Sequence, residues 1–237
     1  MDFDAIFTAY YSQYRADSDV PSSTDDEYTV GLALANEAVN RWKHYDNMFW
    51  KELFTTHQDS VAAVKVLTTG TTTYTTATDF VSAGGFVRVN GTGGGLETAY
   101  PIINPEEVQF KTDEAVYCYF TGSPKDGHTL HLNPAPTANL NGLSFDFTYY
   151  KAPTQFTTGT DITEMGDPYF IVHRMLATQF RAARNPYYAS AKADAENALN
   201  QMKMVNDSGT WANPMTVADT SGMVFGQGVG NSFFGGR

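Results

Sequence analysis

The chain has 237 residues, 42% of them hydrophobic, which is enough for one large domain or two small ones with a buried core. Its formal net charge of −11 argues against a surface that grips DNA or an anionic membrane, because such surfaces need clustered Lys and Arg. The same charge is compatible with a protein that surrounds DNA without holding it. The single cysteine, Cys118, excludes a disulfide framework within the chain.

The sequence predicts neither a signal peptide nor a membrane span. Residues 1–4 are acidic and have no positively charged region, so we expect no signal peptide. No apolar run approaches the ~18 residues that a membrane span needs, so we expect no membrane anchor.

The N-terminal part, residues 1–58, is predicted to form helices. Residues 3–15 place apolar side chains at helical spacing, namely Phe3, Ile6, Phe7, Tyr10 and Tyr14. After a linker, Thr24 and Glu27 match the capping-box pattern, with Thr24 as the cap and Glu27 reaching back. Apolar residues then keep intervals of three and four from Leu34 to Leu53. This second helix is therefore predicted to be long and to end between Asp46 and Thr55.

The middle of the chain, residues 59–155, is predicted to be an inserted antiparallel β-domain, either a sandwich or a partly open barrel. β-favouring runs are 61–67, 68–78, 80–81, 86–89, 116–120, 129–132 and 143–150. Turn signals separate them at Gly84-Gly85, Asn90-Gly91, 93–95, 123–127 and Asn141-Gly142. Along the last run, Leu143, Phe145, Phe147 and Tyr149 are predicted to share one face.

The C-terminal helices, residues 160–206, are predicted to complete a helical bundle. Asp167-Pro168 and Asn185-Pro186 each place a capping side chain before a proline at the first helical position. The first helix then has an apolar face of Val172, Met175, Leu176, Phe180 and Ala183. The second has a small-residue stripe, which we predict to pack subunits together: Ala191, Ala195, Ala198 and Met202.

Residues 207–237 are predicted to be an extended C-terminal arm rich in glycine and aromatic residues. A simple disordered tail is poor in aromatic residues, which favours an arm that anchors on a partner. The predicted anchors are Trp211, Met215, Phe225, Phe233 and Phe234. The alternative is a terminus that packs on its own domain or on nothing. The fold class is therefore α+β, a helical bundle from both ends of the chain around an inserted β-domain.

Candidate catalytic and metal-binding patterns are incomplete. His128 and His131 lie on one predicted strand with opposite orientations, and no HExxH or cysteine cluster accompanies them. The glycines at 91–95 fail the phosphate-binding pattern because Leu96 takes the place of the last glycine. No GxSxG motif is present, and adjacent acidic pairs do not match a glycosidase pair. We therefore predict no catalytic residue, metal or cofactor.

Two stretches resemble head–tail connector (adaptor) proteins of tailed bacteriophages. Residues 122–136, GSPKDGHTLHLNPAP, are similar to the turn and the strand ending in two prolines of that family. Residues 145–154, FDFTYYKAPT, are similar to its next strand. Asp161 to Phe170 and Trp50-Lys51-Glu52-Leu53 also fit, so that the resemblance spans about residues 3–205. Met165-Gly166-Asp167-Pro168 departs from the family's isoleucine–proline.

The resemblance implies a non-enzymatic ring, usually of twelve subunits, docked on the portal protein in the virion neck after assembly in the host cytoplasm. It implies a tail, nozzle or stopper protein as the neighbour on the other side, and double-stranded DNA passing through without sequence-specific contact. One alternative is another neck component, such as a stopper or tail terminator. A second alternative is a glycan-binding or glycan-cleaving β-domain, since aromatic residues could form a glycan-binding face, among them Tyr149, Tyr150, Tyr187, Tyr188 and Trp211.

Overall fold

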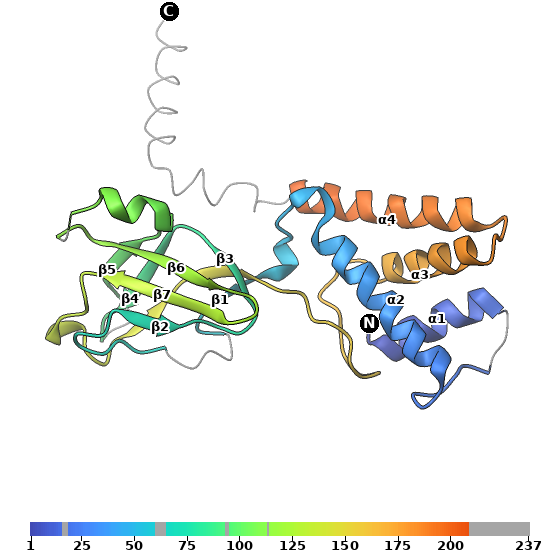
Figure 1. Cartoon of the computed structure of the whole chain (residues 1–237), viewed down its shortest axis with the longest axis horizontal. Helices are drawn as coiled ribbons and strands as arrows, with labels where there is room; N and C mark the ends of the chain where they lie inside the picture. The colour runs from blue at the N-terminus through green and yellow to red at the C-terminus, as the bar shows by residue number, and fades with distance from the viewer. Residues whose placement is uncertain (16–18, 60–64, 93–94, 113, 209–237) are drawn as a thin grey trace, which may run out of the picture. The chain divides into compact units, whose positions relative to one another are not determined.

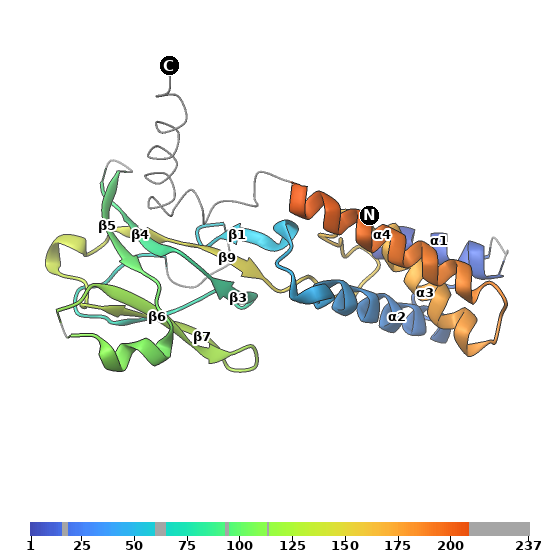
Figure 2. The same cartoon turned by 90° about the horizontal axis from the view of Figure 1, so that it is seen from above.

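The computed structural model describes residues 1–15, 19–59, 65–92, 95–112 and 114–208. These residues form two compact units. The helical unit contains residues 1–53 and 153–208, and the β unit contains residues 54–152 (Figures 1 and 2). The predicted α+β class is confirmed, with helices from both ends of the chain and antiparallel sheets between them.

The helical unit is built on four helices: α1 (Phe3–Arg15), α2 (Asp26–Lys43), α3 (Tyr169–Ala182) and α4 (Tyr188–Ser208). Helix α3 packs against each of the other three. In Figure 1, α4 and α1 lie on opposite sides of α3. The second C-terminal helix extends to Ser208, so the first two residues of the predicted arm are helical.

Helix α1 has the predicted bounds, but the predicted start and end of α2 are wrong. Its first residue is Asp26, and no side chain caps it through a hydrogen bond. Glu27 does not reach back to Thr24, because its carboxylate instead accepts hydrogen bonds from Tyr11 and Arg15 of α1. A tertiary contact has therefore replaced the local capping box.

Helix α2 ends at Lys43, earlier than its apolar spacing predicts, because the backbone soon leaves the helical region. Asp46 and Asn47 have positive φ values of 56° and 53°. The chain then turns back, so that the Trp50 indole N–H donates to the Trp42 carbonyl at 2.8 Å. A carbonyl at the helix end thus gains a donor, and two short 3-10 turns follow, Tyr45–Asn47 and Lys51–Leu53.

Both predicted capping residues of the C-terminal helices are in place. The Tyr169 N–H donates to the Asp167 carboxylate at 3.0 Å, and the Tyr187 N–H donates to the Asn185 side-chain oxygen at 2.9 Å. The regular helices begin at Tyr169 and Tyr188, one residue or two after the prolines. The predicted α3 face is buried except for Ala183, which is exposed at the C-terminal end of the helix.

Aromatic rings from distant segments fill the core of the helical unit. Phe3 lies 5.1 Å from Tyr28 and 5.5 Å from Phe156, between ring centroids. Gly31 of α2 faces the ring of Phe7, and a Cβ atom added to this glycine would lie 2.3 Å from Phe7 Cε2. The missing side chain at position 31 therefore lets α1 and α2 approach closely.

The β unit contains three antiparallel sheets of three strands, in the orders β1-β9-β3, β2-β7-β6 and β5-β4-β8. The strands are β1 (Phe54–Thr56), β2 (Thr73–Thr75), β3 (Phe80–Ala83), β4 (Phe86–Asn90), β5 (Leu96–Pro101), β6 (Tyr117–Ser123), β7 (Gly127–Asn133), β8 (Ser144–Asp146) and β9 (Thr148–Lys151). The sequence patterns miss β1 and β5, and they also miss the 3-10 helix Pro105–Phe110.

One core joins the three sheets of the β unit. It takes side chains from each sheet, for example Tyr74 from β2, Val87 from β4 and Tyr149 from β9. Within it, the ring of Phe80 lies 4.8 Å from that of Phe120 and 5.5 Å from that of Tyr149. Leu143, Phe145, Phe147 and Tyr149 of the last predicted run face this core, but the run is divided between two strands, β8 and β9, of different sheets.

Candidate interaction surfaces

The alanine stripe predicted to pack subunits together is buried within the chain. Ala191, Ala195, Ala198 and Met202 are at most 8% exposed, on a helix that packs against α3. Their small side chains allow close contact between the two helices. The stripe therefore stabilises the helical unit itself, and its part in subunit packing stays a prediction.

The last turns of α4, which precede the predicted arm in the sequence, are fixed to the segment after α2. Lys203 forms an ion pair with Asp46 at 2.5 Å. The Asn206 side-chain oxygen accepts the Lys51 N–H at 2.9 Å. Nearby on the same helix, Met204 is 70% exposed. The five predicted anchors of the arm lie outside the described residues: Trp211, Met215, Phe225, Phe233 and Phe234.

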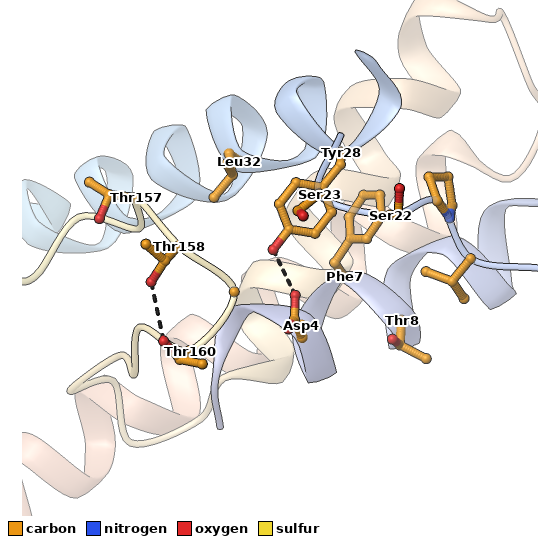
Figure 3. A pocket seen from close by; sticks show the side chains of 13 residues that line it. Asp4, Phe7, Thr8, Ser22, Ser23, Tyr28, Leu32, Thr157, Thr158 and Thr160 are labelled. Atoms are coloured by element: carbon orange, nitrogen blue, oxygen red, sulfur yellow. Dashed lines mark hydrogen bonds between the residues drawn. The ribbon is translucent and has the colours of Figure 1, made fainter. Parts of the chain in front are cut away.

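A groove of about 580 Å³ lies between the start of α1, the start of α2 and the loop before α3 (Figure 3). Figure 3 shows hydroxyl groups around it, including those of Thr8, Ser22 and Thr157, with the rings of Phe7 and Tyr28 between the two helices. Sequence patterns did not single out this groove, because its walls come from segments about 130 residues apart in the sequence. Its lining combines hydroxyl groups and aromatic rings with the carboxylate of Asp4.

Two carboxylates organise the groove. The Tyr28 hydroxyl donates to Asp4 at 2.6 Å, and burial together with this hydrogen bond raises the pKa of Tyr28 to about 12. Asp161 accepts the backbone N–H groups of Thr157 and Thr158, which lowers the pKa of its carboxyl to about 2. Both carboxylates are therefore used to hold the loop and the tyrosine in place.

A second, smaller pocket of about 190 Å³ is formed by α1, the start of α2 and Gln179 of α3. We call it the tyrosine pocket, because Tyr10, Tyr11 and Tyr14 line it. The ring centroids of Tyr10 and Tyr14 are 5.8 Å apart, and Arg15 lies 5.4 Å from the ring of Tyr14. Tyrosine and arginine side chains in a pocket are typical of protein–protein contacts. The sequence already contained a signal for this pocket, because Tyr11 and Tyr14 follow Tyr10 by one and four residues and so lie on neighbouring parts of one helix face.

The sequence model of one protein family, the SU10 adaptor protein family, matches residues 7–218. The chain belongs to this family. Among curated proteins, none matches the sequence. The matched range covers both units and reaches Trp211 and Met215 of the predicted arm. The resemblance inferred from the sequence is thus confirmed: the protein is a phage head–tail adaptor, a structural protein.

Two histidines of this SU10 adaptor, His128 and His131, lie against aromatic rings in the β unit. His131 Nε2 lies 2.7 Å from the Thr121 hydroxyl, and its ring stacks on Tyr119 at 4.6 Å. His128 lies beside Phe80, and burial lowers the pKa of both histidines. Over the residues that the structure describes, no cluster of three or more His, Cys, Asp or Glu side chains could hold a metal ion.

The remaining chemical candidates of the adaptor also lie in structural positions. Cys118 is fully buried, and burial raises the pKa of its thiol to about 12. The glycine-rich loop connects the antiparallel strands β4 and β5, with the Gly91 N–H donating to the Gly95 carbonyl at 2.8 Å. This is a hairpin connection, and not the strand-to-helix turn of a phosphate-binding loop. No helix in the described part of the chain is long and apolar enough to cross a membrane.

Proposed function

We propose that this adaptor forms a ring of twelve subunits that docks on the portal protein and connects the phage head to the tail. Double-stranded DNA passes through the ring without sequence-specific contact, and a tail, nozzle or stopper protein binds on the far side. The subunit is made in the host cytoplasm and becomes part of the virion neck. The observation that carries this proposal is the family match over residues 7–218.

The charge of the chain supports a channel that does not bind DNA tightly. The net charge of −11, repeated around a ring, would repel phosphates wherever it faces the channel. The division of the chain into two compact units also supports the proposal, because each unit can offer its own surface to a different neighbouring protein. The arm after Ser208 is proposed to reach one of these neighbours through its aromatic residues.

The test is reconstitution of the purified protein with its portal protein. Native mass spectrometry should detect a closed oligomer, and electron micrographs should show a ring with a central hole on the portal. Subunits that stay monomeric and never bind the portal would contradict the proposal. Crosslinks only to tail-tube proteins would instead favour another neck component, such as a stopper or tail terminator.

The arm can be tested by deleting residues 209–237. We expect the truncated protein to keep its thermal unfolding transitions and to lose affinity for its neighbour. A lowered unfolding temperature of the isolated subunit would show that the arm packs on its own domain.

A further inference from the structure

Two segments of the helical unit carry opposite and unmixed charge. Residues 19–27 contain four carboxylates and no Lys or Arg, whereas residues 181–192 contain three cations and no Asp or Glu. The chain has 26 acidic and 15 basic residues, so the basic segment has the opposite sign to the chain as a whole. The first segment ends with the first two residues of α2, and the second spans the end of α3, the turn after it and the start of α4.

The acidic segment forms one wall of the tyrosine pocket. Asp26, Glu27 and the half-exposed Val30 lie opposite the tyrosines of α1. Arg15 neutralises one of the two carboxylates through its 2.8 Å ion pair with Glu27. The other, Asp26, is exposed and makes no hydrogen bond or ion pair within the described chain. The pocket thus combines aromatic walls with one net negative charge, which suits a guanidinium group.

The basic segment is the exposed turn that would fill such a pocket. Arg181 and Arg184 are exposed, and neither forms an ion pair with another described residue. Arg184 is a turn residue with a φ of 52°, and Tyr187, three residues later in the sequence, is 67% exposed. Lys192 is different, because it pairs with Glu196 on α4 at 3.5 Å. Exposed Arg and Tyr on a tight turn have the composition of an interface anchor.

We propose that the α3–α4 turn of one copy docks into the tyrosine pocket of a second copy, with Arg184 facing Asp26. The inference rests on the proposed ring, whose subunit contact it identifies. The occupant is a second copy because this chain itself supplies both halves of the complementary pair. In the proposed ring, the turn of each copy enters the pocket of the next copy, and a series of such one-way contacts forms a ring when it closes.

The test uses two charge reversals, Arg184→Glu and Asp26→Arg, in the full-length protein. Each variant alone would place like charges in every subunit contact. We expect each to need an at least about tenfold higher protein concentration for ring formation than the unaltered chain. Both positions are exposed, and unchanged circular dichroism and thermal unfolding of the isolated subunit would confirm that the variants fold.

An equimolar mixture of the two variants is the decisive sample. The reversed turn of Arg184→Glu is complementary to the reversed pocket of Asp26→Arg, and the remaining contact is the native one. The mixture should therefore restore rings in which the two variants alternate. The masses of these rings in native mass spectrometry should correspond to equal numbers of the two variants. Lys125→Glu and Glu106→Arg, which reverse exposed charges in the β unit, are the matched controls and should assemble like the unaltered chain.

Three results would overturn the inference: rings of both single variants at the unaltered concentration, no rings from the mixture, or a loss of portal binding with rings intact. The last result would assign the turn to the portal contact. Rings of the reversed variants that still bind portal would leave the proposed function in place. Conversely, the unaltered chain could form rings that the charge reversals abolish but that never bind portal. This outcome would support the inference and contradict the proposed function.

Discussion

The two units bury their cores by different routes. In the β unit, one continuous segment, residues 54–152, supplies all three sheets and the core between them. The helical unit instead joins both parts of the chain that flank this segment. Asn36 of α2 donates to the Phe156 carbonyl at 2.9 Å and accepts its N–H at 2.8 Å, across 120 residues.

This difference indicates where each unit is sensitive to change. The β unit depends on its own consecutive strands, so a change elsewhere in the chain should leave it intact. The helical unit depends on contacts between its two halves, which the chain must bring together across a long connection. A perturbation of one unit should therefore leave the stability of the other unchanged, and four experiments test this difference.

The largest effect is expected for Trp42→Ala in the helical unit. Trp42 is fully buried, 5.3 Å from the ring of Trp50, so its removal leaves a large cavity. We expect a loss of about 3–5 kcal/mol in the unfolding free energy of the helical unit alone. Tryptophan fluorescence follows this unit, and calorimetry resolves both. The control Val30→Ala, at a half-exposed site, should change stability by less than about 0.5 kcal/mol. An equal loss in both units would show that they unfold together.

A smaller loss is expected for Gly31→Ala, which places a Cβ atom against Phe7. Overpacking of this kind costs about 1–3 kcal/mol, and the higher helix propensity of alanine offsets about 1 kcal/mol of it. The control is Gly84→Ala in the β unit, where an added Cβ meets no atom within 4 Å. In a Phe7→Leu background the clash is relieved, and Gly31→Ala should become neutral or stabilising. Denaturant unfolding measures each variant, and additive effects of the two substitutions would contradict the contact.

A pH series should separate the units by the groups that titrate in each. Burial lowers the pKa of His128 and His131 below 6.5, so the unfolded β unit binds protons more readily than the folded one. Its stability is therefore full above pH 6.5 and falls as the pH drops through the lowered values. In the helical unit, the contribution of Asp161 is present above its ordinary pKa of 3.8 and is lost only as the pH falls towards 2.

Thermal unfolding between about pH 7 and about pH 3 measures this order, with the β unit weakening first. Replacing both histidines, His128→Gln with His131→Gln, should flatten the response of the β unit. Asp161→Asn should remove the low-pH loss in the loop 157–161, as followed by hydrogen exchange. Earlier weakening of the helical unit would contradict the assignment.

The smallest effect is expected from excising the β unit. Residues 54–152 expressed alone should unfold cooperatively within about 5 °C of their transition in the full chain. Residues 1–53 expressed alone are the contrasting sample, and they should stay unfolded because α1 and α2 lack α3. A β fragment that fails to fold would show that its stability comes from the helical unit.

Local sequence signals predicted much of this fold. The Asx–Pro pairs at 167 and 185 mark helix starts because their capping bonds form within two residues. The glycine turns and the alternating apolar residues likewise determined most hairpins. The signals failed where a distant residue competes: Glu27 bonds to Arg15 and Tyr11 rather than to its own helix end. The end of α2 was missed because Trp42 and Trp50 set it through a fold-back that helical periodicity does not contain.

The candidate surfaces were harder to predict than the elements. The tyrosine pocket joins α1, α2 and α3. The sequence pattern of a single helix does not show that Asp26 and Tyr14 line the same pocket. The contact of the alanine stripe with a second subunit stays a prediction, and the sequence does not say which helix of the same chain covers the stripe. Burial in the chain answers this in favour of α3.

The order of segments along the chain also has a consequence during synthesis. The ribosome completes α1 and α2 first, then the whole β unit, and only afterwards α3, on which the first two helices pack. At about 5–20 residues per second, roughly 100 residues of β unit delay α3 by about 5–20 s. During this interval the aromatic faces of α1 and α2 remain uncovered. A nascent chain can therefore complete its helical unit only after α3 has followed the whole β unit out of the ribosome.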